Sequence, residues 1–463
     1  MEKLKRVLWP SLFLISDQAI ALSPENIFQN DHEYVERVIA KHVLSNKGFE
    51  FLLPKDKFKI ISLDPKNKVN DVFNIPGYFS NAVHFWFNVY TLYNSNFSII
   101  HDKNNLSLVY KVLDYTSLLK SVLNHHTKVS LMSQFTLNKV RALKKSIRNL
   151  SLNINIGKDE KDIKKMLIKA RIKIPKTSKK RTKFYNRLAF NMRAQTGQKN
   201  NITQGIINFS NYRKTTEKII SIINLPEELL AIPFLESSYN VNAVSKVGAA
   251  GVWQFMPRIA RHFMSQSKQT DMRLNPLLAS VAAFHLLKQN KQILKRWDLG
   301  ITAYNSGTKH IVRARKKFKK QNLSLQEYIE RYKHPHIGFA TKNFYSEYLA
   351  LVYALAYQDE LFDFKSVKIK SLNIRSNKLY IYVTKCRFVP NNIYYALRKS
   401  SPDFKYLNLH LKYKKRSYPR GTLLVSDIHL TSKRYLKVSL KNIKQMYPKY
   451  WKKLVRNYSC STK

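Results

Sequence analysis

The segment 225–257 reads LPEELLAIPFLESSYNVNAVSKVGAAGVWQFMP and contains the features that decide how this chain folds. Pro226 suits the first turn of a helix, and Glu227 and Glu228 favour the positive N-terminal end of that helix. The helix then stays apolar until it reaches a single carboxylate, Glu236. We therefore predict an apolar helix that presents one acidic side chain near its C-terminal end.

Glu236 has no acidic neighbour downstream in this region, because the next Asp or Glu is Asp271. A carboxyl group at the end of an apolar helix, without a local acidic partner, should have its pKa raised by desolvation. A raised pKa suits a general acid that works near neutral pH. A glutamate on a helix is most often a solvated surface group, so Glu236 by itself is weak support for a catalytic site.

The residues that follow Glu236 add features of a ligand cleft. Gly248 and Gly251 would let a ligand approach the backbone closely. Tyr239, Trp253 and Tyr304 offer flat faces of the kind that stack on sugar rings. Trp253 fits a hydrophobic core equally well, so both interpretations of this side chain stay open.

The rest of the chain is organised around this segment. Helical spacing of apolar residues is clearest over 200–362, where Asn275 and Pro276 begin a helix. Residues 130–200 combine helical spacing with runs of Lys and Arg, which favours a solvated helical face over a binding arm. We also predict a core-forming aromatic segment at 83–90, strands at 98–102, 106–110, 378–384 and 422–426, and a helix at 391–399.

The composition points to a folded protein in a polyanionic environment. The 463 residues include 82 Lys plus Arg and 29 Asp plus Glu, which gives a net charge of +53. A hydrophobic fraction of 44% excludes wholesale disorder. The charge suits nucleic acid, an anionic membrane or a polymer rich in carboxylates and phosphates, and does not choose among them. Two cysteines exclude a disulfide scaffold and a Cys-based zinc ribbon.

The first 21 residues have the layout of a secretory signal peptide. A basic start, MEKLKR, precedes a short apolar run and the small-residue site Ala19-Ile20-Ala21. We expect cleavage after Ala21 and export, which weakens a nucleic-acid interpretation of the charge. The start of an ordinary buried helix is the alternative for these residues.

Several classes of site are excluded by missing motifs. His-Glu-x-x-His does not occur, and His125-His126 and His334-x-His336 lack further ligands at metal spacing. A phosphate-binding glycine loop and a Gly-x-Ser-x-Gly elbow are also missing from the sequence. We therefore expect neither a metal nor a cofactor.

Three motifs in order carry a resemblance to a known family. They are Glu236-Ser237-Ser238-Tyr239-Asn240, the glycine-rich run from Gly248 to Gln254, and Ala303-Tyr304-Asn305-Ser306-Gly307. The region 190–360 resembles the lytic murein transglycosylases with a goose-lysozyme-like fold, and is most similar to the membrane-bound lytic murein transglycosylase D group. The chain departs from the family pattern at Val252 and Ile259, and a family tyrosine falls at Phe344 with Tyr345 beside it.

The resemblance implies non-hydrolytic cleavage of the β-1,4 bond between N-acetylmuramic acid and N-acetylglucosamine in peptidoglycan, giving 1,6-anhydro ends. Glu236 would be the only catalytic acid and base, and the sugar's 2-acetamido group would make a second carboxylate unnecessary. The substrate-binding residues it implies are Ser237, Ser245, Gly251, Gln254, Tyr304, Asn305 and Tyr345.

The expected fold is mainly α, α+β overall, in four parts. These are a signal peptide at 1–21, a mostly helical N-terminal extension at 22–185, a lysozyme-like transglycosylase domain at 186–362, and a small α/β module at 363–463 that is LysM-like but degenerate. We expect a monomer in the periplasm or cell envelope of a bacterium. Its partners would be peptidoglycan strands and, through charge, anionic envelope polymers, with no nucleic acid.

Three other functions stay open at this point. A muramidase could use the same Glu236 but admit water, and a second acidic group across the cleft would favour it. A non-catalytic peptidoglycan-binding envelope protein would fit the departures at Val252, Ile259 and Phe344. A cytosolic nucleic-acid binder rests on charge alone.

Overall fold

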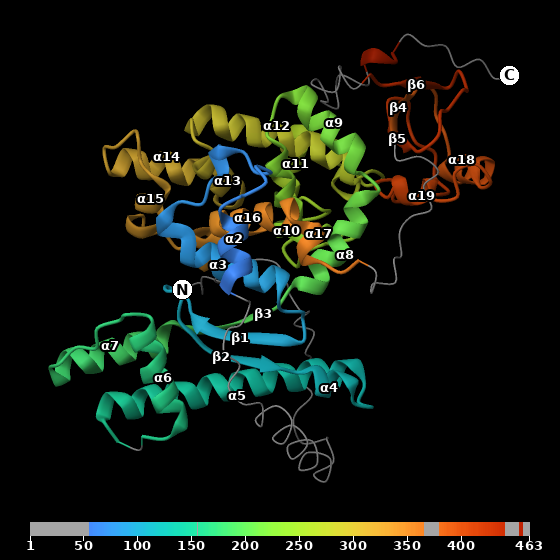
Figure 1. Ribbon diagram of the computed structural model, residues 1–463. Coiled ribbons are helices and arrows are strands. Elements are labelled where there is room, and N and C mark those ends of the chain that lie inside the picture. The colour runs from blue at the N-terminus through green and yellow to red at the C-terminus, as the bar shows by residue number, and fades with distance from the viewer. Residues whose placement is uncertain (1–54, 155, 365–378, 440–452, 457–463) are drawn as a thin grey trace, which may run out of the picture.

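A computed structural model describes residues 55–154, 156–364, 379–439 and 453–456. These residues are mainly helical and include two small antiparallel sheets (Figure 1). The expected signal peptide lies outside the described residues. None of the helices in the described ranges is both long enough and apolar enough to span a bilayer.

The centre of the helical core is α16 (Phe339–Ala356). Almost every side chain from Thr341 to Ala354 on this helix is buried, which is the pattern of a helix enclosed on all sides. It packs against α3 (Ser80–Thr91), α13 (Trp297–Ser306) and α10 (Ile232–Ser237). The aromatic segment 83–90 lies on α3 and is buried, as predicted from the sequence.

The second long core helix is α12 (Pro276–Leu294), and it begins where the sequence predicts. The side chain of Asn275 accepts a hydrogen bond from the backbone of Leu278 at 3.1 Å and so caps the helix. The other helices around this core are α2 (Lys55–Ser62), α8 (Lys199–Ser210), α9 (Arg213–Ile223), α11 (Pro257–Phe263), α14 (Thr308–Lys317), α15 (Leu325–Arg331) and α17 (Gln358–Leu361).

The helix predicted to run from Pro226 through Glu236 is divided in two. A 3-10 turn, η4 (Glu227–Ala231), leads into the short helix α10. Pro233 explains the division, because it has no backbone N–H to donate to the preceding turn and is tolerated only at the start of a helix. Glu236 nevertheless lies near the C-terminal end of an apolar helix, as predicted.

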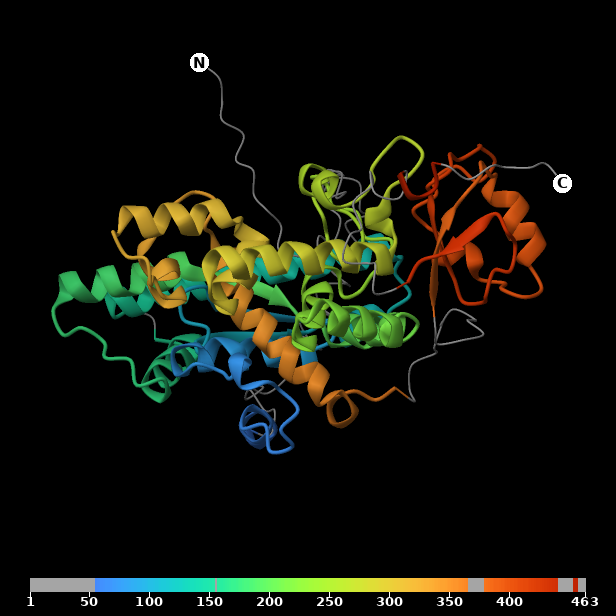
Figure 2. The ribbon, with the colours of Figure 1, turned by 90° about the horizontal axis from the view of Figure 1, so that it is seen from above.

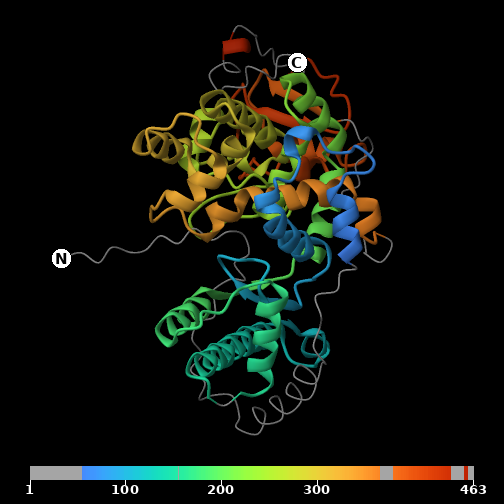
Figure 3. The same ribbon diagram turned by 60° about the vertical axis from the view of Figure 1, so that its left-hand side comes forward.

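A first sheet lies between the helical core and a group of four more helices (Figures 1 and 3). Its strands are β1 (Phe97–Asp102), β2 (Val109–Asp114) and β3 (Met192–Thr196), in the antiparallel order β2-β1-β3. The helices beneath it are α4 (Thr116–Lys120), α5 (His125–Leu152), α6 (Lys158–Lys169) and α7 (Ser178–Asn191), which share a second hydrophobic cluster.

Two sequence-based boundaries in this region are corrected. The second strand begins at Val109 and not at Leu106, because Asp102 accepts hydrogen bonds from the backbones of Asn104 and Asn105 and lengthens the turn. The expected domain boundary at 185/186 falls inside α7, which is a continuous helix.

The C-terminal module, residues 379–439, stands to one side of the core (Figure 2). Its strands are β4 (Tyr380–Thr384), β5 (Leu423–Ser426) and β6 (Tyr435–Lys437) in the order β5-β4-β6, with α18 (Pro390–Leu397) and α19 (Phe404–Leu407) between β4 and β5. These elements confirm the predicted strands at 378–384 and 422–426 within the described residues, and the predicted helix at 391–399.

The module contacts the loop 266–275 of the core. The Asn275 amide donates to the carbonyl oxygen of Leu407 at 2.7 Å, and the backbone of Asp271 donates to that of His410 at 2.9 Å. The side chain of Asn275 therefore serves both the start of α12 and the attachment of the module.

Gly205 fixes the distance between α8 and the turn that follows Glu236. A Cβ atom at this position would lie 2.4 Å from the carbonyl oxygen of Ser238. We expect Gly205→Ala to lower the free energy of unfolding by about 1–3 kcal/mol, because backbone must move to accept the methyl group. Thermal or urea unfolding measures this change. Gly77→Ala is the matched control, since nothing lies within 4 Å of its Cβ position, and equal stability of both variants would contradict the prediction.

Candidate active site

Glu236 is the next-to-last residue of α10, and the chain turns sharply after it. Ser238 and Tyr239 adopt left-handed backbone conformations with φ of 47° and 54°, which end the helix. The residue is half-buried, and its neighbours Phe234 and Leu235 are buried. Burial raises the pKa of the Glu236 carboxyl to about 8, with a further contribution from the charge of Glu347. At pH 7 most of this carboxyl is therefore protonated and can donate a proton.

Glu347 is a second acidic residue near Glu236, and the sequence analysis did not identify it. It lies on α16, is only 6% exposed, and accepts a hydrogen bond from the Tyr90 hydroxyl at 3.2 Å. Burial raises its pKa to about 8, although the Tyr90 hydrogen bond and the charge of Arg193 act in the opposite direction. The expectation that Glu236 has no acidic partner holds along the chain, but the fold places Glu347 within electrostatic reach of it.

The glycine-rich segment 248–254 closes over the end of α10. The Ser237 hydroxyl lies 3.0 Å from the carbonyl oxygen of Val252 and so links this helix to the segment. Ser245 organises the loop before it, because its hydroxyl accepts the backbone N–H of Ala249 at 2.9 Å. Two of the predicted substrate-binding serines thus hold the shape of the site through backbone contacts.

Gly251 is required by the chain's own packing. Its φ is +74°, and a Cβ atom would lie 1.7 Å from the carbonyl oxygen of Arg273. The Arg273 side chain is buried and donates to the carbonyl oxygens of Gly248 at 2.6 Å and Phe255 at 2.9 Å. Asp271 pairs with this guanidinium at 2.8 Å, which balances its charge. The sequence suggested that a ligand would approach Gly251 closely. In the structure it is the backbone of Arg273 that lies against this glycine.

Gln254 and Trp253 end the glycine-rich segment with different orientations. Gln254 has a left-handed φ of 46°, is partly exposed, and donates through its amide to the Gly251 carbonyl oxygen at 2.9 Å. Trp253 is fully buried, and its indole N–H donates to Ser280 at 2.8 Å. The core interpretation of Trp253 is therefore the correct one, and Tyr239, at 1% exposure, is likewise in the core.

The third motif joins the first two. The Tyr304 hydroxyl donates to the carbonyl oxygen of Trp253 at 2.7 Å, which ties the end of α13 to the glycine-rich segment. Burial and then the charge of Glu236 raise the pKa of Tyr304 well above its usual range, so its phenol lies within electrostatic reach of that carboxyl. Asn305 follows, and its side-chain oxygen accepts a hydrogen bond from Thr341 at 2.8 Å.

Tyr345 is not brought to this group. It is 4% exposed and packs against Phe79 with ring centroids 5.9 Å apart. Burial and the charge of Asp298 raise its pKa, and Asp298 lies at the opposite end of α13 from Tyr304. Phe344, at the position of the family tyrosine, is also buried.

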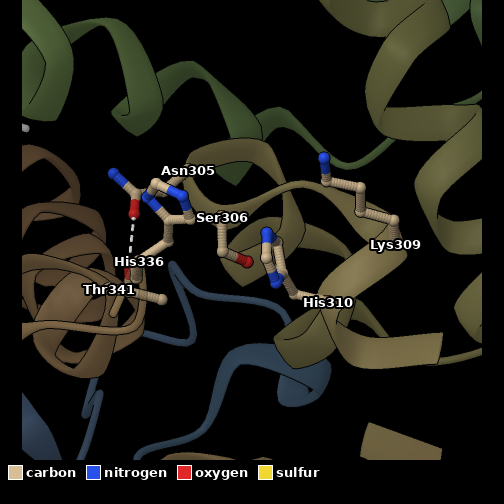
Figure 4. A pocket seen from close by; sticks show the side chains of 6 residues that line it. All are labelled: Asn305, Ser306, Lys309, His310, His336 and Thr341. Atoms are coloured by element: carbon tan, nitrogen blue, oxygen red, sulfur yellow. Dashed lines mark hydrogen bonds between the residues drawn. The ribbon is translucent and has the colours of Figure 1, made fainter. Parts of the chain in front are cut away.

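A small open pocket of about 210 Å³ lies beside Asn305 (Figure 4). Figure 4 shows Lys309 and His310 on one side of it, and His336 with the hydrogen-bonded pair Asn305 and Thr341 on the other. Only Asn305 was singled out from the sequence. Lys309 and His310 lie two and three residues after the end of the third motif, and this proximity is the signal that could have identified them. Within the described ranges, no group of three His, Cys, Asp or Glu residues is placed to hold a metal ion.

Comparison with known proteins agrees with this geometry. Residues 222–326 match the family described as Transglycosylase SLT domain. This segment is similar to the transglycosylase SLT family. It contains Glu236, the glycine-rich segment and the Tyr304–Asn305 pair, and so confirms the family that the three motifs indicated.

Two kinds of curated relative cover parts of the chain. The chain is 33% identical over 103 residues to the "Membrane-bound lytic murein transglycosylase D" of Escherichia coli K12, which is 22% of this chain and 23% of that protein. It is 36% identical over 93 residues to the "Putative tributyltin chloride resistance protein" of Alteromonas sp. strain M-1, or 20% of this chain and 45% of that protein. The chain thus matches about a quarter of the length of the transglycosylase and less than half of the second relative.

The SLT match omits part of the site that the structure shows. Tyr90 on α3, Arg193 on β3 and Glu347 on α16 all lie outside residues 222–326. The surroundings of Glu236 in this protein therefore include residues supplied by three flanking segments.

We expect Glu347→Gln to lower the pKa of Glu236 below about 8, because the substitution removes a negative charge that opposes ionisation of Glu236. Carboxyl chemical shifts of selectively labelled protein, followed over pH 5–10, measure this pKa. Glu227→Gln is the control, since this exposed acid on η4 removes the same charge farther from the site. An unchanged Glu236 titration in Glu347→Gln would show that the two carboxyl groups are not coupled.

Proposed function

We propose that this protein is a peptidoglycan lytic transglycosylase that cleaves the β-1,4 bond between N-acetylmuramic acid and N-acetylglucosamine without consuming water. The observation that carries the proposal is the Glu236 carboxyl at the end of α10, whose pKa is raised to about 8 and which lies within electrostatic reach of Tyr304, itself hydrogen-bonded to the glycine-rich segment. The transglycosylase SLT domain and its similarity to a lytic murein transglycosylase support the same reaction class.

In the proposed reaction, Glu236 first gives its proton to the glycosidic oxygen of the leaving sugar. The positive charge at the anomeric carbon is relieved by the 2-acetamido group of the muramic acid, as in substrate-assisted glycosidases. Glu236, now ionised, then takes the proton of the muramic acid 6-hydroxyl. That oxygen attacks the anomeric carbon and closes the 1,6-anhydro ring, so the enzyme ends in its starting protonation state.

A pKa of about 8 suits both halves of this cycle. The carboxyl is protonated when substrate binds near neutral pH, and its conjugate base is strong enough to take a proton from a hydroxyl group. Gln254, Asn305 and Tyr304 are all partly exposed, and Gln254 and Asn305 would orient the sugar. Ser237, Ser245 and Gly251 would act through the shape of the loop, and Tyr345 has no place in this proposal.

The hydrolytic alternative has one observation in its favour, because Glu347 is a second acidic group near Glu236. Glu347 is almost completely buried, and burial raises its pKa to about 8. A carboxyl that is mostly protonated at pH 7 is a poor base for activating water. This environment favours the lytic reaction over hydrolysis.

A non-catalytic binding role would rest on the departures from the family pattern. Val252 and Phe344 are buried apolar side chains, and Ile259 is exposed on α11. All three side chains are apolar and carry no ionisable group, so these departures leave the proposed acid, Glu236, in place.

We further propose that the protein acts as a monomer, exported to the periplasm or cell envelope, where its positive charge favours contact with anionic polymers. Residues 363–463 would form a degenerate LysM-like module. The two helices between the antiparallel strands β4 and β5 support this proposal.

We expect Glu236→Gln to reduce digestion of purified peptidoglycan by about 10²–10⁴-fold, because an amide cannot donate the proton. Mass spectrometry of the wild-type products should show anhydro-muropeptides, one water lighter than the hydrolysed forms. Hydrolysed products would favour the muramidase alternative. Undiminished digestion by Glu236→Gln, with Glu227→Gln as the folded control, would contradict catalysis by Glu236.

The pH profile provides an independent check. Because Glu236 must be protonated to begin the reaction, we expect kcat/KM to fall as pH rises through about 8. Initial rates of muropeptide release from pH 6 to 10 measure this decline. A profile that stays flat to pH 10 would show that another group supplies the proton.

A further inference from the structure

The pocket beside Asn305 is rich in basic groups; we call it the basic pocket and define it by Asn305, Ser306, Lys309, His310, His336 and Thr341. Lys309 and His310 lie in the first turn of α14, whose N-terminal end is the positive end of the helix dipole. Asn305 directly follows Tyr304, whose phenol is within electrostatic reach of Glu236. The basic pocket therefore borders the proposed substrate cleft.

The electrostatic neighbours of the basic pocket all have the same sign. Lys309, Arg313, His334 and His336 act on His310, and each of them disfavours a charge on that ring. The groups that act on His334 are basic as well. The largest electrostatic influences on both histidines are therefore basic, and Lys309 is the residue that brings a positive charge to the lining of the pocket.

His310 provides the observation that points to a ligand. The residue is only 4% exposed, yet its Nδ1 atom has no hydrogen-bond partner. An unpartnered buried polar atom costs about 1–3 kcal/mol, so such atoms commonly mark a place where something else binds. Burial, followed by its basic neighbours, lowers the pKa of His310 to about 4, which leaves the ring neutral at pH 7. A neutral imidazole can donate one N–H to an anionic oxygen.

The histidine rings are arranged for packing against each other. The His310 and His334 ring centroids are 4.5 Å apart in an edge-to-face contact, and His334 lies 5.2 Å from His336. Their nitrogens do not converge on a metal position in the described structure. An anion held by Lys309, the His310 ring and His336 fits this arrangement better than a cation.

We propose that the basic pocket binds a carboxylate group of the peptidoglycan strand, carried either by the stem peptide or, where the stem has been removed, by the lactyl group of muramic acid. This inference rests on the proposed function, since it names a second feature of the same substrate. Lys309 would supply the charge, and His310 and His336 would supply directed donors. Recognition of this group would place the strand in register with Glu236 and would favour strands that carry free carboxylates.

The test measures binding with the Glu236→Gln protein, which should hold strands without cutting them. Three probes are compared by sedimentation or fluorescence anisotropy: intact strands, strands whose carboxylates have been converted to methylamides, and strands treated with an amidase, which removes the stems and frees the lactyl carboxylate. We expect the strand that displays the recognised carboxylate, either the intact strand or the stripped one, to bind about 5- to 10-fold more tightly than the methylamide form, which corresponds to one partly exposed charged contact. Tight binding of the stripped strand would assign the lactyl group, and weak binding would assign the stem.

Lys309→Gln with His336→Asn, both at exposed positions, should remove this preference in the Glu236→Gln protein. Lys317→Gln is the matched control, because it removes the same charge from an exposed site at the other end of α14. Equal binding of all three probes, or a preference that survives the double substitution, would overturn the proposal for the basic pocket. Failure of the Glu236→Gln protein to bind any strand, or its continued cutting, would instead overturn the proposed function.

Discussion

Burial of two carboxyl groups in one helical core is the constraint on which this structure depends. Glu236 and Glu347 lie on α10 and α16, which pack against each other, and each has a pKa raised to about 8. Burying a charged carboxylate is costly, so both groups are held in the neutral form at pH 7. Because these pKa values are higher in the folded than in the unfolded state, the two groups favour folding less and less as pH rises from about 4.5 through about 8. The raised pKa that suits Glu236 for proton donation is therefore linked to a loss of stability between about pH 4.5 and 8.

The core that maintains these conditions is assembled from distant parts of the chain. The Trp86 indole on α3 donates to Asn343 on α16 at 3.3 Å, and Tyr90, one turn later, donates to Glu347. Arg193 on β3 contributes a positive charge to the same carboxyl. Residues 80–91 are thus part of the wall around the site, although the SLT family match begins only at residue 222.

The sequence predicted those features that depend on neighbouring residues. The apolar helix that ends at Glu236, the cap at Asn275 and the buried segment 83–90 follow from local patterns of apolar and capping side chains. The partnership between Glu236 and Glu347 could not be derived in this way, since the two residues are far apart in the chain. A single acidic residue in the largely apolar helix α16 was the one available signal. The role of Trp253 was ambiguous because aromatic side chains suit both a hydrophobic core and a surface that stacks on sugars. Its complete burial and its hydrogen bond to Ser280 place it in the core.

The loop 266–275 has contacts on both of its sides. On one side, Arg273 donates hydrogen bonds to the backbone at Gly248 and Phe255. On the other side, Asp271 and Asn275 donate hydrogen bonds to the C-terminal module. Insertions or deletions in this loop would disturb both sets of contacts together. We therefore expect its length to vary less among relatives than the length of an ordinary surface loop. The module and the catalytic turn should consequently be inherited as a matched pair, and exchanging modules between relatives should succeed only when this loop is exchanged with them.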